Sequence, residues 1–121
     1  LDAVMKLETM LELSDMARAV FVNPLVLDYI VRLVEATRTA RQVRMGSSVR
    51  GARNLTKLAK AWAASQGRPF VTPDDVKALA EPVLAHRIVL DPEAEFDGVT
   101  ANAVIGQILL DVAPPTGGGE E

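Results

Sequence analysis

The chain has 121 residues, of which 49% are hydrophobic and 24% charged, and its formal net charge is −3. This is the composition of one globular domain, and the chain is too short for two full hydrophobic cores. It has no cysteine, which excludes disulfides, Cys-His catalysis and zinc sites that use cysteine, and no apolar run reaches the roughly 18 residues of a membrane span. A chain without cysteine is compatible with either redox compartment, and we expect a cytoplasmic protein because no signal-peptide pattern opens the sequence.

The basic residues are distributed unevenly along the chain. The segment from Arg32 to Arg68 holds nine of the 13 basic residues but only one of the 16 acidic residues. Half of the domain is therefore expected to face something negatively charged.

Apolar periodicity and helix-start chemistry predict five helices, which cover about residues 7–19, 23–41, 48–65, 72–81 and 100–112. Short extended segments are expected at residues 20–22, 68–71 and 86–90. Strand propensity is otherwise low, so the predicted fold class is all-α or nearly all-α, a small helical bundle of about five helices.

Two of these helices have features that a structure can test. Pro82 should kink or end the fourth helix near Glu81, because proline lacks the N–H group that a helix interior needs. The second helix should be well buried through its apolar residues Leu27, Ile30, Val31 and Val34.

The third predicted helix is amphipathic. Ser48, or Ser47, is expected to cap its start, and Gly67 is expected to stop it. Its apolar face is predicted to contain Val49, Ala52, Leu55, Leu58, Ala59, Trp62 and Ala63. The basic residues on the opposite side are Arg50, Arg53, Lys57 and Lys60.

The segments between and after the helices have weaker signals. Residues 39–47 are predicted to be a polar, basic connection, and residues 91–97 a solvated acidic loop, since its alternating acids lack EF-hand spacing. We expect residues 1–113 to form the domain and residues 114–121 a flexible tail. Because the chain begins in the approach to a helix rather than with methionine, we expect a fragment that ends near the C-terminus of a longer protein.

The stretch from Met45 to Arg53 combines a glycine-containing loop, a serine N-cap and a helix with Arg50 in its first turn. The free N–H groups and positive dipole end of a helix start suit an anion. Arg50 could add a forked cationic contact to the same anion. An ordinary capped helix with a solvated arginine explains the same pattern.

Catalytic groups are hard to assemble from this sequence. The single histidine, His86, follows an apolar run and is assigned to packing or to a structural hydrogen bond. The chain has neither a G-x-x-x-x-G-K-[ST] phosphate loop nor a glycine-rich dinucleotide fingerprint, so we expect that it is not an enzyme alone.

Two binding functions compete for the charged surfaces. The basic stretch could make a freestanding nucleic-acid-binding module, but aromatic residues hardly interleave with it and the net charge is negative. The acidic half could instead dock a partner of a structural interaction domain.

Four sequence blocks follow one another along the chain: LDYIVRLV at 27–34, MGSSVRGA at 45–52, GRPFVTPDDVKALA at 67–80 and PVLAHRI at 82–88. In this order they resemble the C-terminal helical lid domain of MoxR-family AAA+ ATPases, over nearly the whole chain. The resemblance implies that the lid packs over a nucleotide at the edge of an upstream α/β domain. That domain would contain the phosphate loop, the Mg²⁺-binding acid and the arginine finger.

The resemblance also implies properties of the full-length parent. It would be a ring-forming ATPase, usually a hexamer, that hydrolyses ATP with Mg²⁺ and remodels other proteins in the manner of a chaperone. Its partners would be the upstream core domain, neighbouring ring subunits and von Willebrand factor A domain proteins, with no nucleic acid and no membrane span.

The resemblance further assigns candidate site residues. The family's second-sensor arginine, which acts in ATP hydrolysis, follows a G-x-S-P-R-like turn and maps onto Arg50, with Ser48 as the cap. Val49 stands where the family usually has proline, so the loop should be less rigid. Arg53 is a second candidate, with a surface role as its alternative. Tyr29 could approach the adenine, with core packing as its alternative.

Overall fold

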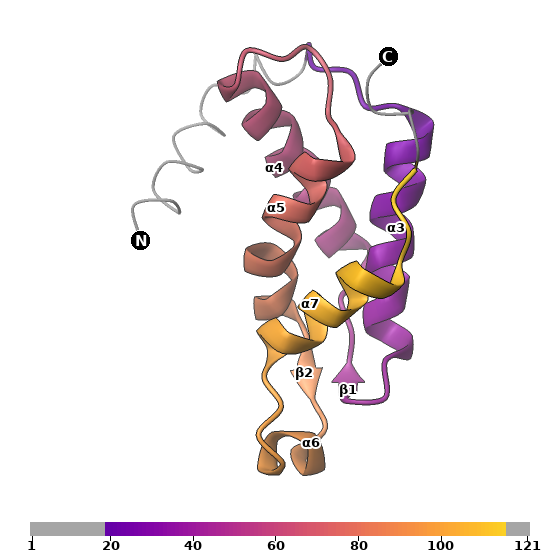
Figure 1. Ribbon diagram of the computed structural model, residues 1–121, viewed down its shortest axis with the longest axis vertical. Helices are drawn as coiled ribbons and strands as arrows, with labels where there is room; N and C mark the ends of the chain where they lie inside the picture. The colour runs from indigo at the N-terminus through magenta and orange to yellow at the C-terminus, as the bar shows by residue number, and fades with distance from the viewer. Residues whose placement is uncertain (1–18, 116–121) are drawn as a thin grey trace.

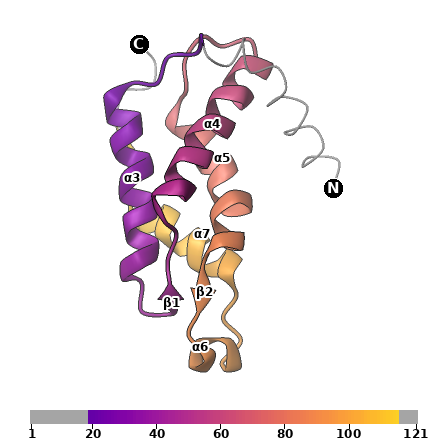
Figure 2. The ribbon, with the colours of Figure 1, turned by 180° about the vertical axis from the view of Figure 1, so that it is seen from behind.

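The computed structural model describes residues 19–115, in which three long helices pack against one another. They are α3 (Pro24–Thr39), α4 (Val49–Ser65) and α5 (Pro73–Leu84). A shorter helix, α7 (Ala101–Asp111), crosses α3 and α5 on the face seen in Figure 1, and α4 lies on the opposite face, seen in Figure 2. No helix of this part of the chain is long and apolar enough to cross a membrane.

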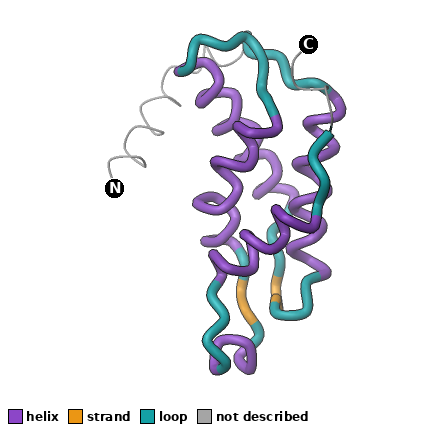
Figure 3. The backbone as a smooth tube through the Cα atoms, in the orientation of Figure 1, coloured by secondary structure: helices purple, strands orange, loops and turns teal. Residues whose placement is uncertain are grey.

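A two-stranded antiparallel sheet lies at one end of the helices, with α6 (Pro92–Phe96) beyond it (Figure 3). Its strands are β1 (Val43–Met45) and β2 (Val89–Leu90), and the 3₁₀ helix η1 (Ala85–Arg87) joins α5 to β2. The described chain is therefore nearly all helical, which confirms the predicted fold class.

The hydrophobic core lies between α3, α4, α5 and α7. The largest fully buried apolar side chains in it are Tyr29, Ile30, Leu33, Leu55, Leu84 and Ile105. On α4 the buried side is the predicted one at Leu55, Ala59 and Ala63. Of the other elements, α4 packs most extensively against α5.

Local capping explains where most helices begin. The Oδ1 atom of Asn23 accepts from the N–H of Leu25 at 2.8 Å, and Pro24 follows at the first helical position. The hydroxyl of Thr100 accepts from the N–H of Ala103 at 3.1 Å. Each bond satisfies a first-turn donor that the helix itself leaves unpaired. These starts agree with the prediction.

Two predictions about the long helices are wrong in part. Pro82 was expected to kink or end α5 near Glu81, and it does not end it: the helix continues to Leu84, which packs into the core. The helix α3 is not buried all round, since Leu27 and Val31 are exposed whereas Ile30 and Val34 are buried.

The predicted connections also contain more structure than expected. Residues 39–47 include β1, which pairs with β2. The segment at residues 86–90, which was expected to be extended, is a strand only at its end, because its first residues belong to η1. The acidic residues 91–97 form the short helix α6, with Asp91 as its N-cap. His86 is exposed on η1 rather than packed. The predicted helix at residues 7–19 lies almost entirely outside the described residues, as does most of the predicted tail.

The link between α4 and α5 contains a network of polar contacts. Gly67 has a φ of 76°, a conformation that favours glycine, and it lets the N–H of Arg68 donate back to the carbonyl of Ala63 at 2.9 Å. This confirms the predicted stop.

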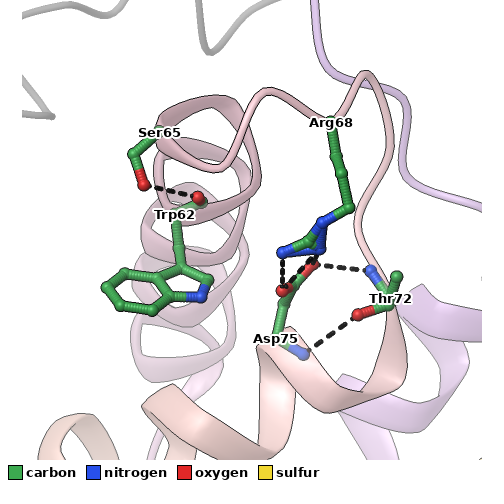
Figure 4. A network of polar contacts seen from close by, with 5 residues as sticks. All are labelled: Trp62, Ser65, Arg68, Thr72 and Asp75. Atoms are coloured by element: carbon green, nitrogen blue, oxygen red, sulfur yellow. Dashed lines mark hydrogen bonds and ion pairs between the residues drawn. The ribbon is translucent and has the colours of Figure 1, made fainter.

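The guanidinium of Arg68 then donates to both carboxylate oxygens of Asp75 (Figure 4). Asp75 is only 3% exposed. Its Oδ2 atom also accepts from the N–H of Thr72 at 2.8 Å, and its own N–H donates to the Thr72 hydroxyl at 3.2 Å. This capping box and the forked ion pair together join the end of α4 to the start of α5.

We expect Asp75→Ala to lower the free energy of unfolding by about 2–4 kcal/mol, because it removes a cap and leaves the Arg68 guanidinium without its partner. Urea unfolding followed by circular dichroism measures the change. The matched control is Asp74→Ala, which removes an exposed acid from the same helical turn and should cost less than about 1 kcal/mol. Equal losses in the two variants would contradict the role given to the ion pair.

Candidate functional site at the start of α4

The start of α4 is held tightly against the end of α3. A Cβ atom on Gly46 would lie 2.6 Å from the Cα of Arg38, so this position has no room for a side chain. The N–H of Ser47 donates to the buried hydroxyl of Thr37 at 2.9 Å, and that hydroxyl donates to the carbonyl of Val34 at 2.6 Å. The backbone that leads into α4 is therefore positioned by α3.

A second close approach occurs within the first turn of α4. A Cβ atom on Gly51 would lie 1.9 Å from the Oγ of Ser47 and 3.6 Å from the Cδ of Arg87. The backbone of Gly51 does not have a positive φ, so space rather than conformation explains the glycine. Ser47 is buried beneath the first turn instead of capping it.

Ser48 occupies the N-cap position, with extended backbone angles, but its side chain makes no capping hydrogen bond. Ser48 thus has the predicted N-cap position, but the predicted capping bond of its side chain is absent. Ser47 does not replace it, because its hydroxyl donates to the carbonyl of Ser48 at 3.5 Å and accepts no first-turn N–H. The other α-helices of the described chain, α3, α5, α6 and α7, each have a capping side chain. The first turn of α4 thus keeps amide donors that no side chain of residues 19–115 caps.

The basic residues of α4 face solvent as predicted. Arg50, Arg53 and Lys57 are exposed and Lys60 is partly exposed. In the part of the chain that the structure describes, none of the four forms an ion pair with an acid. Val49, which was predicted on the apolar face, is 70% exposed, because at the first position of the helix it lies beyond the surface that the core covers. Cations and free amides therefore share one helix start.

Tyr29 lies elsewhere. It is 0% exposed and packs in the core on α3, about two turns before the Thr37 that contacts the α4 start. Burial raises the pKa of its hydroxyl, and Arg32, whose guanidinium lies 5.6 Å from the ring centre, opposes this shift. The structure thus favours the packing alternative for Tyr29 and does not bring it together with Arg50.

Arg87 was not among the predicted site residues. It is exposed on η1, and its side chain lies beside Gly51, so a second arginine approaches the first turn of α4. The only sequence feature that could have indicated this contact is the glycine at position 51, and a glycine does not show which side chain lies beside it.

We expect Gly51→Ala to destabilise the fold by about 1–3 kcal/mol, because the new methyl group displaces the Ser47 hydroxyl. Thermal unfolding measures the effect. Ser47→Ala should restore much of the loss in the double variant, since it removes the displaced atom. Gly106→Ala is the control: nothing lies within 4 Å of its Cβ position, so it should be neutral or stabilise α7 by up to about 1 kcal/mol. Equal effects at positions 51 and 106 would contradict the proposed contact.

No group of three or more His, Asp or Glu side chains within residues 19–115 is arranged to hold a metal ion. The site therefore offers cations and amide donors to an anion, and it offers no metal ligands of its own among these residues.

Comparison with known proteins identifies the architecture. The sequence model of the AAA lid domain matches residues 35–108. Chaperone MoxR1 of Mycobacterium tuberculosis is 35% identical over 115 residues, which are 88% of this chain and 30% of that protein. The uncharacterized protein YeaC of Bacillus subtilis is 42% identical over 88 residues, which are 73% of this chain and 28% of that protein.

A crystal structure of a protein from Cytophaga hutchinsonii that is assigned as an ATPase superposes with a TM-score of 0.81 at 34% identity, covering 84% of this chain and 34% of that chain. This chain thus spans about a third or less of the length of these relatives. The lid-domain match covers most of the described helices, and the relatives include proteins named MoxR. The chain therefore belongs to the AAA lid domain family and is a lid domain of the MoxR type.

Proposed function

We propose that this chain is the nucleotide-sensing lid of a ring-forming MoxR-family ATPase. In this proposal Arg50 contacts the β- and γ-phosphates of ATP, which an upstream α/β domain of the same protein binds. The observation that supports it best is the start of α4 in a lid domain of this family: an exposed arginine in the first turn of a helix whose N-cap side chain makes no capping bond.

The geometry fits a phosphate for three reasons. The positive end of the α4 dipole and its free amides attract an anion. Arg50 adds a delocalised charge with several donors, and no acid of the described residues competes for it. The close contacts at Gly46 and Gly51 fix the direction of the first turn, so the donors are positioned before a ligand arrives.

Arg50 would then couple ATP hydrolysis to motion of the lid. With ATP bound, its guanidinium stabilises the charge that spreads over the γ-phosphate oxygens in the transition state. Cleavage and release of that phosphate remove part of the charge that Arg50 attracts. The attraction between lid and core falls, and the lid can swing away.

The remaining parts of the proposal concern the full-length protein. The Mg²⁺ that neutralises phosphate charge would be held by acids of the upstream domain. We propose a cytoplasmic ring, a hexamer by resemblance, with a chaperone-like remodelling role such as the name of MoxR1 indicates. Neighbouring subunits and a von Willebrand factor A domain protein would be its partners.

In the full-length protein, Arg50→Ala should lower the ATP turnover number by roughly 10²-fold, the usual effect of removing one charged group that stabilises a transition state. The fold should be unaffected, because Arg50 is exposed and forms no ion pair in the described chain. Steady-state hydrolysis assays measure turnover, and thermal unfolding checks the fold.

Arg53→Ala and Lys57→Ala are matched controls, since they remove exposed cations one and two turns further along α4. Both should turn over ATP almost normally. Unchanged turnover in Arg50→Ala would refute the sensor role, and a loss confined to Arg53→Ala would move the role to Arg53. Tight binding of the chain to a short DNA duplex at low salt, falling steeply as salt rises, would instead favour the nucleic-acid alternative.

A further inference from the structure

The chain leaves α7 in an extended conformation and runs beside α3 toward the start of that helix (Figure 1). We call residues 112–115 the α7 strap. Val112 packs against the hydrophobic core, and the two prolines that end the strap are partly buried. Within the described chain, the rest of the strap makes one hydrogen bond, in which the Arg32 guanidinium donates to the carbonyl of Ala113 at 2.9 Å. One side chain therefore ties this segment to α3.

Arg32 is oriented for this contact by its own helix. Its Nε atom donates to the carboxylate of Asp28, one turn earlier, at 2.9 Å, and its Nη1 atom donates to the strap. The guanidinium also lies over the ring of Tyr29, 5.6 Å from the ring centre. The planar fork of an arginine can serve these partners at once. Release of Arg32 would loosen the strap and uncover one face of the ring.

The side chain beneath Arg32 is buried at a cost. Tyr29 is 0% exposed, and its hydroxyl has no hydrogen-bond partner among the residues that the structure describes. A buried hydroxyl without a partner is unfavourable, because it has given up its bonds to water. An opening that admits water beside Tyr29 recovers part of this free energy. Local opening at Arg32 is therefore less costly than loss of the strap contact alone would suggest.

We propose that the α7 strap opens from α3 while the rest of the domain stays folded, and that Arg32 is the latch that controls how often it opens. The open form exposes one face of Tyr29 and loosens the last turn of α7. The closed form depends on the hydrogen bond to Ala113, which none of the contacts between α4 and α5 requires. The latch is independent of any role of Arg50 toward a nucleotide.

The first test compares Arg32→Ala with Arg38→Ala. Both arginines lie on α3 and pair with an acid of that helix, but of the two only Arg32 contacts the strap in the described chain. We expect Arg32→Ala to speed hydrogen–deuterium exchange roughly tenfold in peptides that cover residues 107–115, the usual effect of losing one charged hydrogen bond. Peptides of α4 should exchange as before, and Arg38→Ala should change neither rate.

Nitration by tetranitromethane is the second readout, because the chain contains a single tyrosine. Tyr29 should be modified about tenfold faster in Arg32→Ala than in the unaltered chain, and no faster in Arg38→Ala. A chain with both Pro114→Gly and Pro115→Gly keeps the latch but gives the open strap more conformational freedom. It should raise both the exchange rate and the nitration rate several-fold.

The proposal is overturned if the position 32 and position 38 variants behave alike. It is also overturned if peptides of α4 speed up together with those of α7, because the strap would then open only when the whole domain unfolds. Arg32→Lys tests the forked contact, since lysine keeps the charge but has one nitrogen for the two acceptors. Unchanged rates in Arg32→Lys would contradict the assignment of the latch to the hydrogen bond with Ala113.

Discussion

The ion pair of Arg68 with Asp75 is the interaction on which the arrangement of the long helices depends. It lies where α4 ends and α5 begins, and Asp75 also belongs to the capping box that starts α5. A buried carboxylate is costly unless its charge and hydrogen bonds are satisfied, and here the Arg68 guanidinium and the Thr72 N–H satisfy Asp75. The N–H of Arg68 also donates to the carbonyl of Ala63, which connects the ion pair to the end of α4, and the contact of Ser47 with Thr37 holds the residues before its start. A helix held at both ends presents Arg50 in a defined direction.

Helix starts that depend on neighbouring residues could be predicted from the sequence. Asn23-Pro24, Thr72-Pro73 and Thr100 each place a capping side chain and the first turn within a few residues, so their chemistry is local. The strand β1 could not be predicted in this way, because its partner β2 lies more than 40 residues away and the two are short. The helix α6 buries no side chain, so its sequence has no apolar periodicity to detect.

The candidate site shows the same division between local and tertiary information. The helical periodicity of the apolar residues in α4 was enough to predict that Arg50 and Arg53 face solvent. It was not enough to predict that Ser47 is buried or that Arg87 lies beside Gly51, because both result from contacts with α3 and η1. Val49 was misplaced since helical periodicity assumes that the core extends along the whole helix. The family resemblance added the role of Arg50, which no local pattern contains.

At the start of α4 the N-cap side chain makes no capping bond, and this affects how the domain would respond to its ligand. In α3, α5 and α7 a side-chain oxygen already accepts from one of the first-turn N–H groups, and an incoming anion would have to displace it there. At Ser48 no such competitor exists, so under the proposed function the phosphate itself completes the helix. Because the contacts at Gly46 and Gly51 already hold this turn in place, the anion would gain its hydrogen bonds without first displacing a side chain or ordering the backbone.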